Sequence, residues 1–151
     1  MALDQATTTG QIVVFSLGDE EYALPIEQVQ EIIRYAEPRS VASNSPSIRG
    51  VISLRGKIVP VCDLASHLGS THTHDEVGGK VVIVEAGEST AGILVDDVAE
   101  VLTISAEDVD DVPTASSEAI NGIAKVGDRL IVLLDTAGIF GGVDLTVAAA
   151  A

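Results

Sequence analysis

The chain has few of the residues that stabilise proteins by special chemistry. Its 151 residues include a single cysteine, Cys62, no tryptophan, and only two tyrosines and two phenylalanines. One thiol cannot close an internal disulfide or complete a cysteine-rich zinc site. A reducing, cytoplasmic location is therefore expected.

Long apolar runs are also absent. A membrane-spanning helix needs roughly 18 to 20 apolar residues in succession, and no stretch of the chain approaches that length. The first residues, MALDQATTTG, have neither the basic start nor the apolar centre of a secretory leader. No direct insertion into a membrane is expected.

Basic residues are scarce: eight Lys and Arg face 23 Asp and Glu, which gives a formal net charge of −15. A strongly negative surface disfavours binding to nucleic acid and to anionic lipid. The partners should therefore be proteins or small molecules, with no nucleic acid among them. The 46% of hydrophobic residues is enough to build the core of one ordinary domain.

Catalytic and nucleotide-binding motifs are missing from the sequence. It contains neither a Walker phosphate loop nor a Gly-x-Gly-x-x-Gly loop, and no Asp-x-Asp-x-Asp-Gly calcium loop. No set of Ser, His and Asp lies in a recognisable nucleophile context. The chain is therefore not expected to be an enzyme, and no cofactor is expected.

One group of histidines has the side chains of a metal site. His67, His72, His74 and Asp75 lie in the polar stretch HLGSTHTHDE, and these residue types bind transition metals. Nothing in the pattern holds a second pair of ligands beside them. No metal site is predicted, although zinc binding by this stretch stays open as an alternative.

The chain contains an internal repeat. Residues 10–33 align without gaps on residues 79–102, a shift of 69, and residues 50–69 align on residues 122–141, a shift of 72. Two blocks in the same order with nearly the same shift indicate two similar units in tandem.

The repeat predicts how the chain is organised. We expect one folded domain over residues 10–142, made of a first subdomain at about 10–78 and a second at about 79–142, with strands possibly exchanged between them. Residues 1–9 and 143–151 are expected to be a flexible N-terminus and a C-terminal tail.

Each repeat begins with the pattern of a β-hairpin. Residues 11–17 form a β-branched run, residues 18–21 are a polar turn, and residues 22–24 suit a short return strand. Strands this short, with turns this frequent, favour small barrels over a doubly wound sheet.

A short helix is expected after the first hairpin. Pro25 suits a first helical turn, and Ile26, Val29 and Ile32 follow at helical spacing on one apolar face. The second repeat has the same pattern around Val98. An apolar helical stripe of this kind belongs more often to a core than to an interface.

The stretch GVISLRGKIVPVCDL, residues 50–64, alternates apolar and mixed positions, which predicts a strand pair. Arg55 and Gly56 interrupt it as a tight turn, because glycine tolerates positive φ. Arg55 is therefore expected to project outward. Arg55 and Lys57 could serve only to keep this tip soluble, or Arg55 could bind an acidic or carbonyl-rich partner.

Four segments together resemble the CheW family of chemotaxis coupling proteins. They are FSLGDEEYALPIEQVQEII, SIRGVISLRGKIVPVCDL, AGILVDDVAEVLTI and GIAKVGDRLIVLLD, in that order. The resemblance covers about residues 10–142. It implies an all-β fold with short helices, built as two tandem SH3-like five-stranded β-barrel subdomains. It also implies a non-catalytic, cytoplasmic adaptor between the signalling tips of chemoreceptors and the regulatory domain of the histidine kinase CheA.

The same resemblance assigns candidate site residues. It implies a groove between the barrels that takes the receptor's helical hairpin. By position, the residues lining the groove would be Val13, Ile26, Val29, Ile32 and Val98.

Two charged positions complete the assignment. Arg55 matches the family's arginine that is implicated in coupling, and Glu31 matches an acidic position associated with partner contacts. The chain departs from the family pattern at Ser53, where Asn is usual, and at Ala65, where Arg is frequent. The loss of that basic residue puts the choice of partner in doubt.

Two alternatives remain from the sequence. The groove between the barrels could hold a small ligand or a metal ion, which would make the chain a sensor. The chain could also be an equivalent adaptor in a surface-motility pathway.

Overall fold

The computed structural model describes residues 9–39, 48–64, 79–86, 89–110 and 120–140. These residues form eleven strands, two 3₁₀ turns and one short α-helix. The strands are β1 (Thr9–Leu17), β2 (Glu20–Pro25), β3 (Val29–Arg34), β4 (Ile48–Leu54), β5 (Lys57–Asp63), β6 (Lys80–Ala86), β7 (Ser89–Val95), β8 (Asp97–Ser105), β9 (Val109–Asp110), β10 (Ile120–Val126) and β11 (Arg129–Leu134). The helical elements are η1 (Ile26–Gln28), η2 (Ala106–Asp108) and α3 (Thr136–Phe140).

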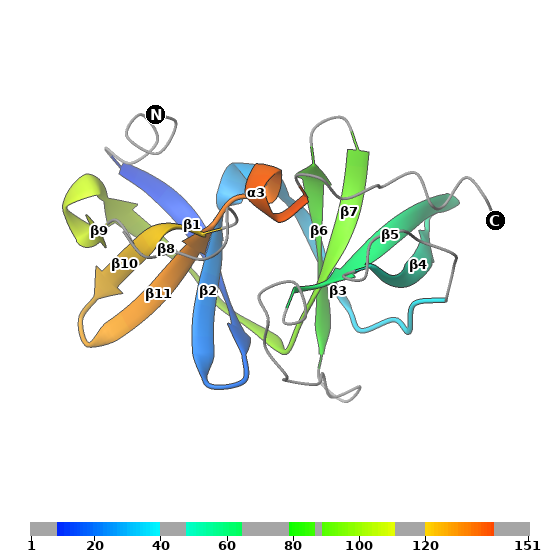
Figure 1. Ribbon diagram of the computed structural model, residues 1–151, viewed down its shortest axis with the longest axis horizontal. Coiled ribbons are helices and arrows are strands. Elements are labelled where there is room, and N and C mark those ends of the chain that lie inside the picture. The colour runs from blue at the N-terminus through cyan, green and yellow to red at the C-terminus, as the bar shows by residue number, and fades with distance from the viewer. Residues whose placement is uncertain (1–8, 40–47, 65–78, 87–88, 111–119, 141–151) are drawn as a thin grey trace.

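The strands form two sheets that lie side by side, with α3 between them (Figure 1). One sheet has the order β8-β1-β2-β11-β10-β9, and we call it barrel A. The other has the order β3-β6-β7-β5-β4, and we call it barrel B. The predicted all-β architecture of two small barrels with short helices is confirmed. Among the described residues, no helix is long and apolar enough to cross a membrane.

The two sequence repeats do not fold as two separate sheets. Strand β2 of the first repeat pairs in parallel with β11 of the second, where Ala23 faces Leu133. Strand β7 of the second repeat pairs in parallel with β5 of the first, where Gly92 faces Val61. In the internal repeat, Gly92 is the counterpart of Ala23 at a shift of 69, and Leu133 is the counterpart of Val61 at a shift of 72. The two parallel pairs are therefore equivalent. The exchange of strands is therefore reciprocal and keeps the same register in both barrels.

The helix predicted around Val29 and Ile32 is wrong. Only residues Ile26–Gln28 form a 3₁₀ turn, and the chain then continues as β3, in which half-buried and exposed residues alternate. The β-branched side chains at these positions favour a pleated strand, and β6 supplies the hydrogen-bonding partner. Val98 likewise lies in a strand, β8, and not in a helix.

The largest hydrophobic cluster lies between the barrels and not inside either one. Phe15 and Leu24 of barrel A meet Val82 and Ile93 of barrel B there, and Phe140 of α3 packs with them. Two smaller clusters fill the individual barrels. Because close packing between the barrels removes this apolar surface from water, it holds the two sheets as one unit.

A truncation in this shared cluster should unfold the whole domain more easily. Phe15 is fully buried, so Phe15→Ala should lower the free energy of unfolding by about 3 to 5 kcal/mol. Leu130→Ala is the control, because Leu130 is 62% exposed and should change stability by only about 0.5 kcal/mol. Urea denaturation followed by circular dichroism measures both. Equal midpoints for the two variants would contradict the role given to this cluster.

Candidate functional site

Arg55 lies in the two-residue turn between β4 and β5, in a strained backbone conformation. Its φ is 51°, and it is the one non-glycine residue with positive φ among the described residues. A side chain in this left-handed region costs roughly 1 to 2 kcal/mol. The equivalent turn of barrel A has Gly127 there, with φ 60°, so the turn geometry alone does not call for an arginine.

Arg55 forms a two-pronged ion pair with Glu31 of β3. Its Nη1 donates to Oε1 of Glu31 at 3.1 Å, and its Nη2 donates to Oε2. The Arg55 side chain is 69% exposed and that of Glu31 is 30% exposed. The hydrogen bonds from Arg55 lower the pKa of Glu31, although desolvation opposes them. The two charged residues assigned from sequence therefore meet in one exposed pair.

Barrel A has a corresponding but different arrangement. Arg129 of β11 binds Glu21 of β2 through two hydrogen bonds of 3.0 and 2.9 Å, and it reaches Glu100 of β8 at 2.8 Å. Glu100 is the counterpart of Glu31 at a shift of 69. The hydrogen bond from Arg129 lowers the pKa of Glu21. In each barrel, an arginine at or next to the hairpin turn thus binds an acidic residue of the first edge strand, β3 or β8.

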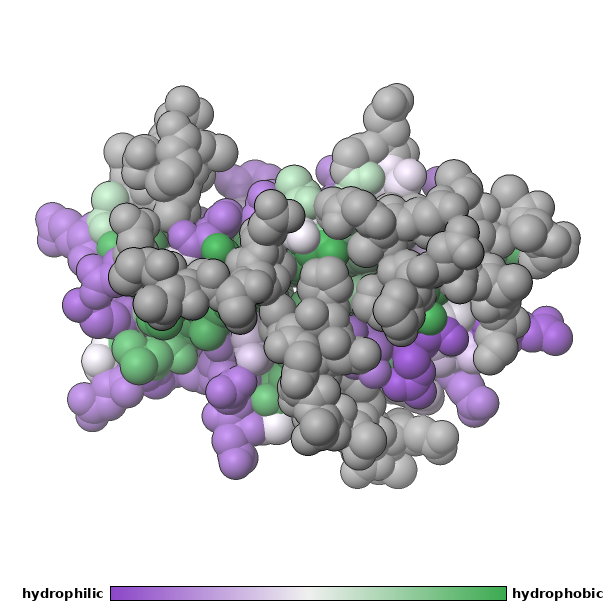
Figure 2. Space-filling view, viewed as in Figure 1, coloured by the Kyte–Doolittle hydropathy of each residue, from purple (hydrophilic) through white to green (hydrophobic). Residues whose placement is uncertain are grey.

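Exposed apolar residues accompany both hairpins. Ile58 of β5 is 47% exposed and its counterpart Leu130 of β11 is 62% exposed. Figure 2 shows a hydrophobic area over β10 and β11 with hydrophilic residues around it. Ile32 and its counterpart Val101 are also exposed, at 40% and 49%, so the exposed apolar positions follow the internal repeat.

The candidate groove residues differ in accessibility. Val29 and Val98 are partly buried and both pack against the cluster between the barrels. Ile26 is half-buried and Ile32 is exposed. Val13 is only 3% exposed, so in this structure its neighbours cover it. The structure brings Val29 and Val98 to one shared core. The assignment of all five residues to a partner-binding groove stays a prediction.

Sequence reasoning missed a polar link between the barrels' connecting segments. Gln28 of η1 donates to Oδ1 of Asp135 at 2.7 Å, and its Oε1 accepts the backbone N–H of Thr136 at 3.0 Å. The amide of Gln28 therefore holds the start of α3. Over a hundred residues separate these partners in the chain, and no local pattern indicates such a contact.

Metal binding receives no support from the part of the chain that the structure describes. No group of three or more His, Cys, Asp and Glu suited to a metal ion occurs among those residues. The histidines His67, His72 and His74 lie outside the described residues.

The ion pair of Arg55 predicts a titration shift. Because Arg55 holds the pKa of Glu31 below its usual range, Arg55→Gly should raise that pKa toward the ordinary value of a glutamate. The pair contributes stability above the ordinary pKa and loses it as the pH falls through the lowered pKa. Carboxyl NMR titration measures this shift, with Glu21 as the control because Arg129 is its partner. An unchanged Glu31 pKa would mean that the pair does not persist in solution.

Comparison with known proteins agrees with this architecture. The CheW-like domain matches residues 11–143. The chemotaxis protein CheW of Klebsiella aerogenes is 33% identical over 133 residues, covering 85% of this chain and 80% of that protein. The chemotaxis protein CheW of Treponema pallidum is 31% identical and covers 89% and 84%.

A solved structure has the same fold. The scaffolding protein TtCheW from Thermoanaerobacter tengcongensis superposes with a TM-score of 0.76 at 33% identity, covering 83% of this chain and 88% of that one. The family match, the relatives and this superposition all extend over most of the chain. The chain belongs to the CheW-like domain family.

Proposed function

We propose that this protein is a non-catalytic adaptor of chemotaxis signalling, which couples chemoreceptors to the histidine kinase CheA. Membership of the CheW-like family over residues 11–143 carries the proposal. The relatives are chemotaxis proteins and the structural neighbour is a scaffolding protein. An adaptor needs surfaces for two partners on one rigid body, and two barrels joined through a shared core suit that need.

Arg55 is proposed as a partner-contacting residue. It is exposed, its planar guanidinium can bind a carboxylate or carbonyl groups, and the sister turn forms with glycine in its place. Backbone strain at an exposed polar residue often accompanies function. The pairing with Glu31 adds a constraint: a partner that recruits Arg55 must offer acceptors that replace the Glu31 carboxylate.

The edge of β3 is proposed as part of the receptor surface. Ile32 exposes its side chain there, while Val29 of the same strand packs against the core between the barrels. An amphipathic receptor helix could lay apolar residues against Ile32 and the exposed part of Val29. Affinity would come from the burial of apolar area, and specificity from the charged residues Glu31 and Arg55 at the rim.

A binding assay tests the adaptor proposal. Wild-type protein should retain both a receptor signalling fragment and CheA in a pull-down. Ile32→Asp should weaken retention of the receptor fragment by about tenfold or more, because it places a charge in an apolar contact. Arg55→Gly should weaken partner binding while leaving thermal stability close to that of the wild type, because it relieves the positive φ as it removes the ion pair.

Lys125→Ala provides the matched control. Lys125 is an exposed cation paired with Asp110 on barrel A, so its loss removes a comparable surface ion pair away from β3. Wild-type protein that retains neither partner would overturn the adaptor proposal. Retention of both partners by Ile32→Asp and by Arg55→Gly would overturn only the residue assignments.

A further inference from the structure

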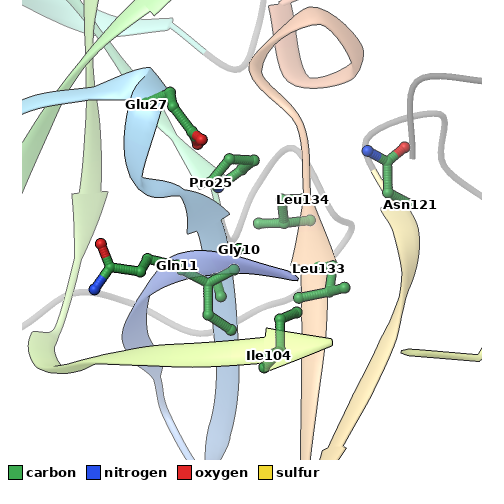
Figure 3. A pocket seen from close by; sticks show the side chains of 10 residues that line it. Gly10, Gln11, Pro25, Glu27, Ile104, Asn121, Leu133 and Leu134 are labelled. Carbon is green, nitrogen blue, oxygen red and sulfur yellow. The ribbon is translucent and has the colours of Figure 1, made fainter. Parts of the chain in front are cut away.

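Barrel A contains a cavity at the end opposite its hairpin turns. Its volume is about 70 Å³, and Ile12, Ala23, Ile104 and Leu133 are among the apolar residues that line it. Glu27 and Asn121 also line it, and Figure 3 shows them on opposite sides of the leucines of β11. The cavity belongs to neither the Arg55 turn nor the edge of β3, so an inference from it does not depend on the proposed function.

The internal repeat shows what occupies the same place in barrel B. Ile104 lies opposite Gly10 in the pairing of β8 with β1. At a shift of 69, the counterparts are Tyr35 and Gly79, and the backbone N–H of Tyr35 donates to the carbonyl of Gly79 at 3.0 Å. Tyr35 packs against the cluster that fills barrel B. A phenol side chain thus covers the core of barrel B at the position where barrel A has only isoleucine.

We propose that the cavity of barrel A binds the side chain of a tyrosine from a protein partner, in the manner in which barrel B accommodates its own Tyr35. The volume is well below the roughly 300 to 1,000 Å³ of ordinary ligand pockets, which excludes a nucleotide or a flavin. It is about half of the ~150 Å³ cavity that encloses benzene in an engineered protein. One ring therefore enters partway, and its hydroxyl end stays at the mouth.

The mouth of the cavity suits a phenol hydroxyl. Glu27 has no hydrogen-bond or ion-pair partner among the described residues, so its carboxylate is available to accept the phenol O–H. A phenol is neutral at physiological pH, so it enters an apolar cavity without the cost of burying a charge.

The charge of barrel A indicates what surrounds the tyrosine in the partner. The described segments that build barrel A carry twelve Asp and Glu but only Lys125 and Arg129 as basic residues. Complementary charge speeds association and suppresses wrong partners. A tyrosine flanked by lysine or arginine therefore fits this surface better than one flanked by acidic residues.

Methyl NMR on the intact protein tests the site, with p-cresol as the mimic of a tyrosine side chain. Titration should produce saturable shifts at the methyl groups of Ile12, Ile104 and Leu133, with a dissociation constant on the order of 1 mM or weaker for so small a ligand. Toluene, which lacks the hydroxyl, should bind several-fold more weakly, and Glu27→Met, which removes the acceptor oxygens at similar size, should remove most of that difference. An absence of saturable shifts at these methyl groups would overturn the proposal.

The repeat supplies matched variants. Ile104→Tyr places the residue of barrel B into barrel A, so it should fill the cavity and weaken p-cresol binding at least tenfold. The reverse change, Tyr35→Ile, should leave binding at Ile104 unchanged. If Ile104→Tyr folds and binds p-cresol as well as the wild type does, the proposal fails. If it does not fold, the ratio of p-cresol to toluene affinity is compared between the wild type and Glu27→Met, and an equal ratio in the two proteins overturns the proposal.

Short peptides test whether the site prefers a tyrosine side chain and whether it prefers basic neighbours beside that tyrosine. The acetylated and amidated peptide Lys-Tyr-Lys should bind more tightly than Lys-Leu-Lys and more tightly than Glu-Tyr-Glu, with shifts at the same methyl groups. Equal binding of Lys-Tyr-Lys and Lys-Leu-Lys would overturn the assignment of tyrosine. Tighter binding of Glu-Tyr-Glu would overturn the expected basic context.

Discussion

The parallel pairing of β2 with β11 and of β5 with β7 is the constraint on which the rest of the structure depends. Because each barrel takes strands from both repeats, neither repeat can complete a sheet by itself. The exchange also brings Phe15 and Leu24 of one barrel against Val82 and Ile93 of the other, which forms the largest core cluster between the barrels. Gln28 then fixes the start of α3 from the other repeat. The two barrels are consequently one rigid support, and surfaces on both can act in a fixed relation to each other.

On this duplicated support, the two barrels differ where they face solvent. Arg55 replaces a glycine of the sister turn, and Tyr35 covers a core that its counterpart Ile104 leaves open. The segments of barrel B hold six of the eight basic residues and four described acidic ones, whereas those of barrel A hold two basic and twelve acidic residues. Because the backbone repeats closely while charge and side-chain size do not, the differences are available for distinguishing partners.

The sequence predicted the duplication, the hairpins and the turn at Arg55, because these depend on local pattern and on self-similarity. It failed at β3, where Val29 and Ile32 have a spacing that suits a helix, while pairing with β6 makes the segment a strand. The resemblance named Arg55 and Glu31, but their pairing depends on how the barrel closes and could not be predicted from residues that lie 24 apart. It also named Val13, which the structure buries. Burial of this kind depends on how neighbouring strands pack. The residue pattern of a single strand does not indicate it.

The exchange of strands also determines when each strand can pair during synthesis of the chain. Strand β2 leaves the ribosome early, yet the strand beside it, β11, lies over a hundred residues later, as the contact of Glu21 with Arg129 shows. One edge of the first hairpin therefore stays unpaired while nearly all of the chain is synthesised. Contacts so distant in sequence also make folding slow. The charged residues Glu20 and Glu21 at the start of β2 are then useful before the fold exists, because charge on an open edge discourages pairing with another chain.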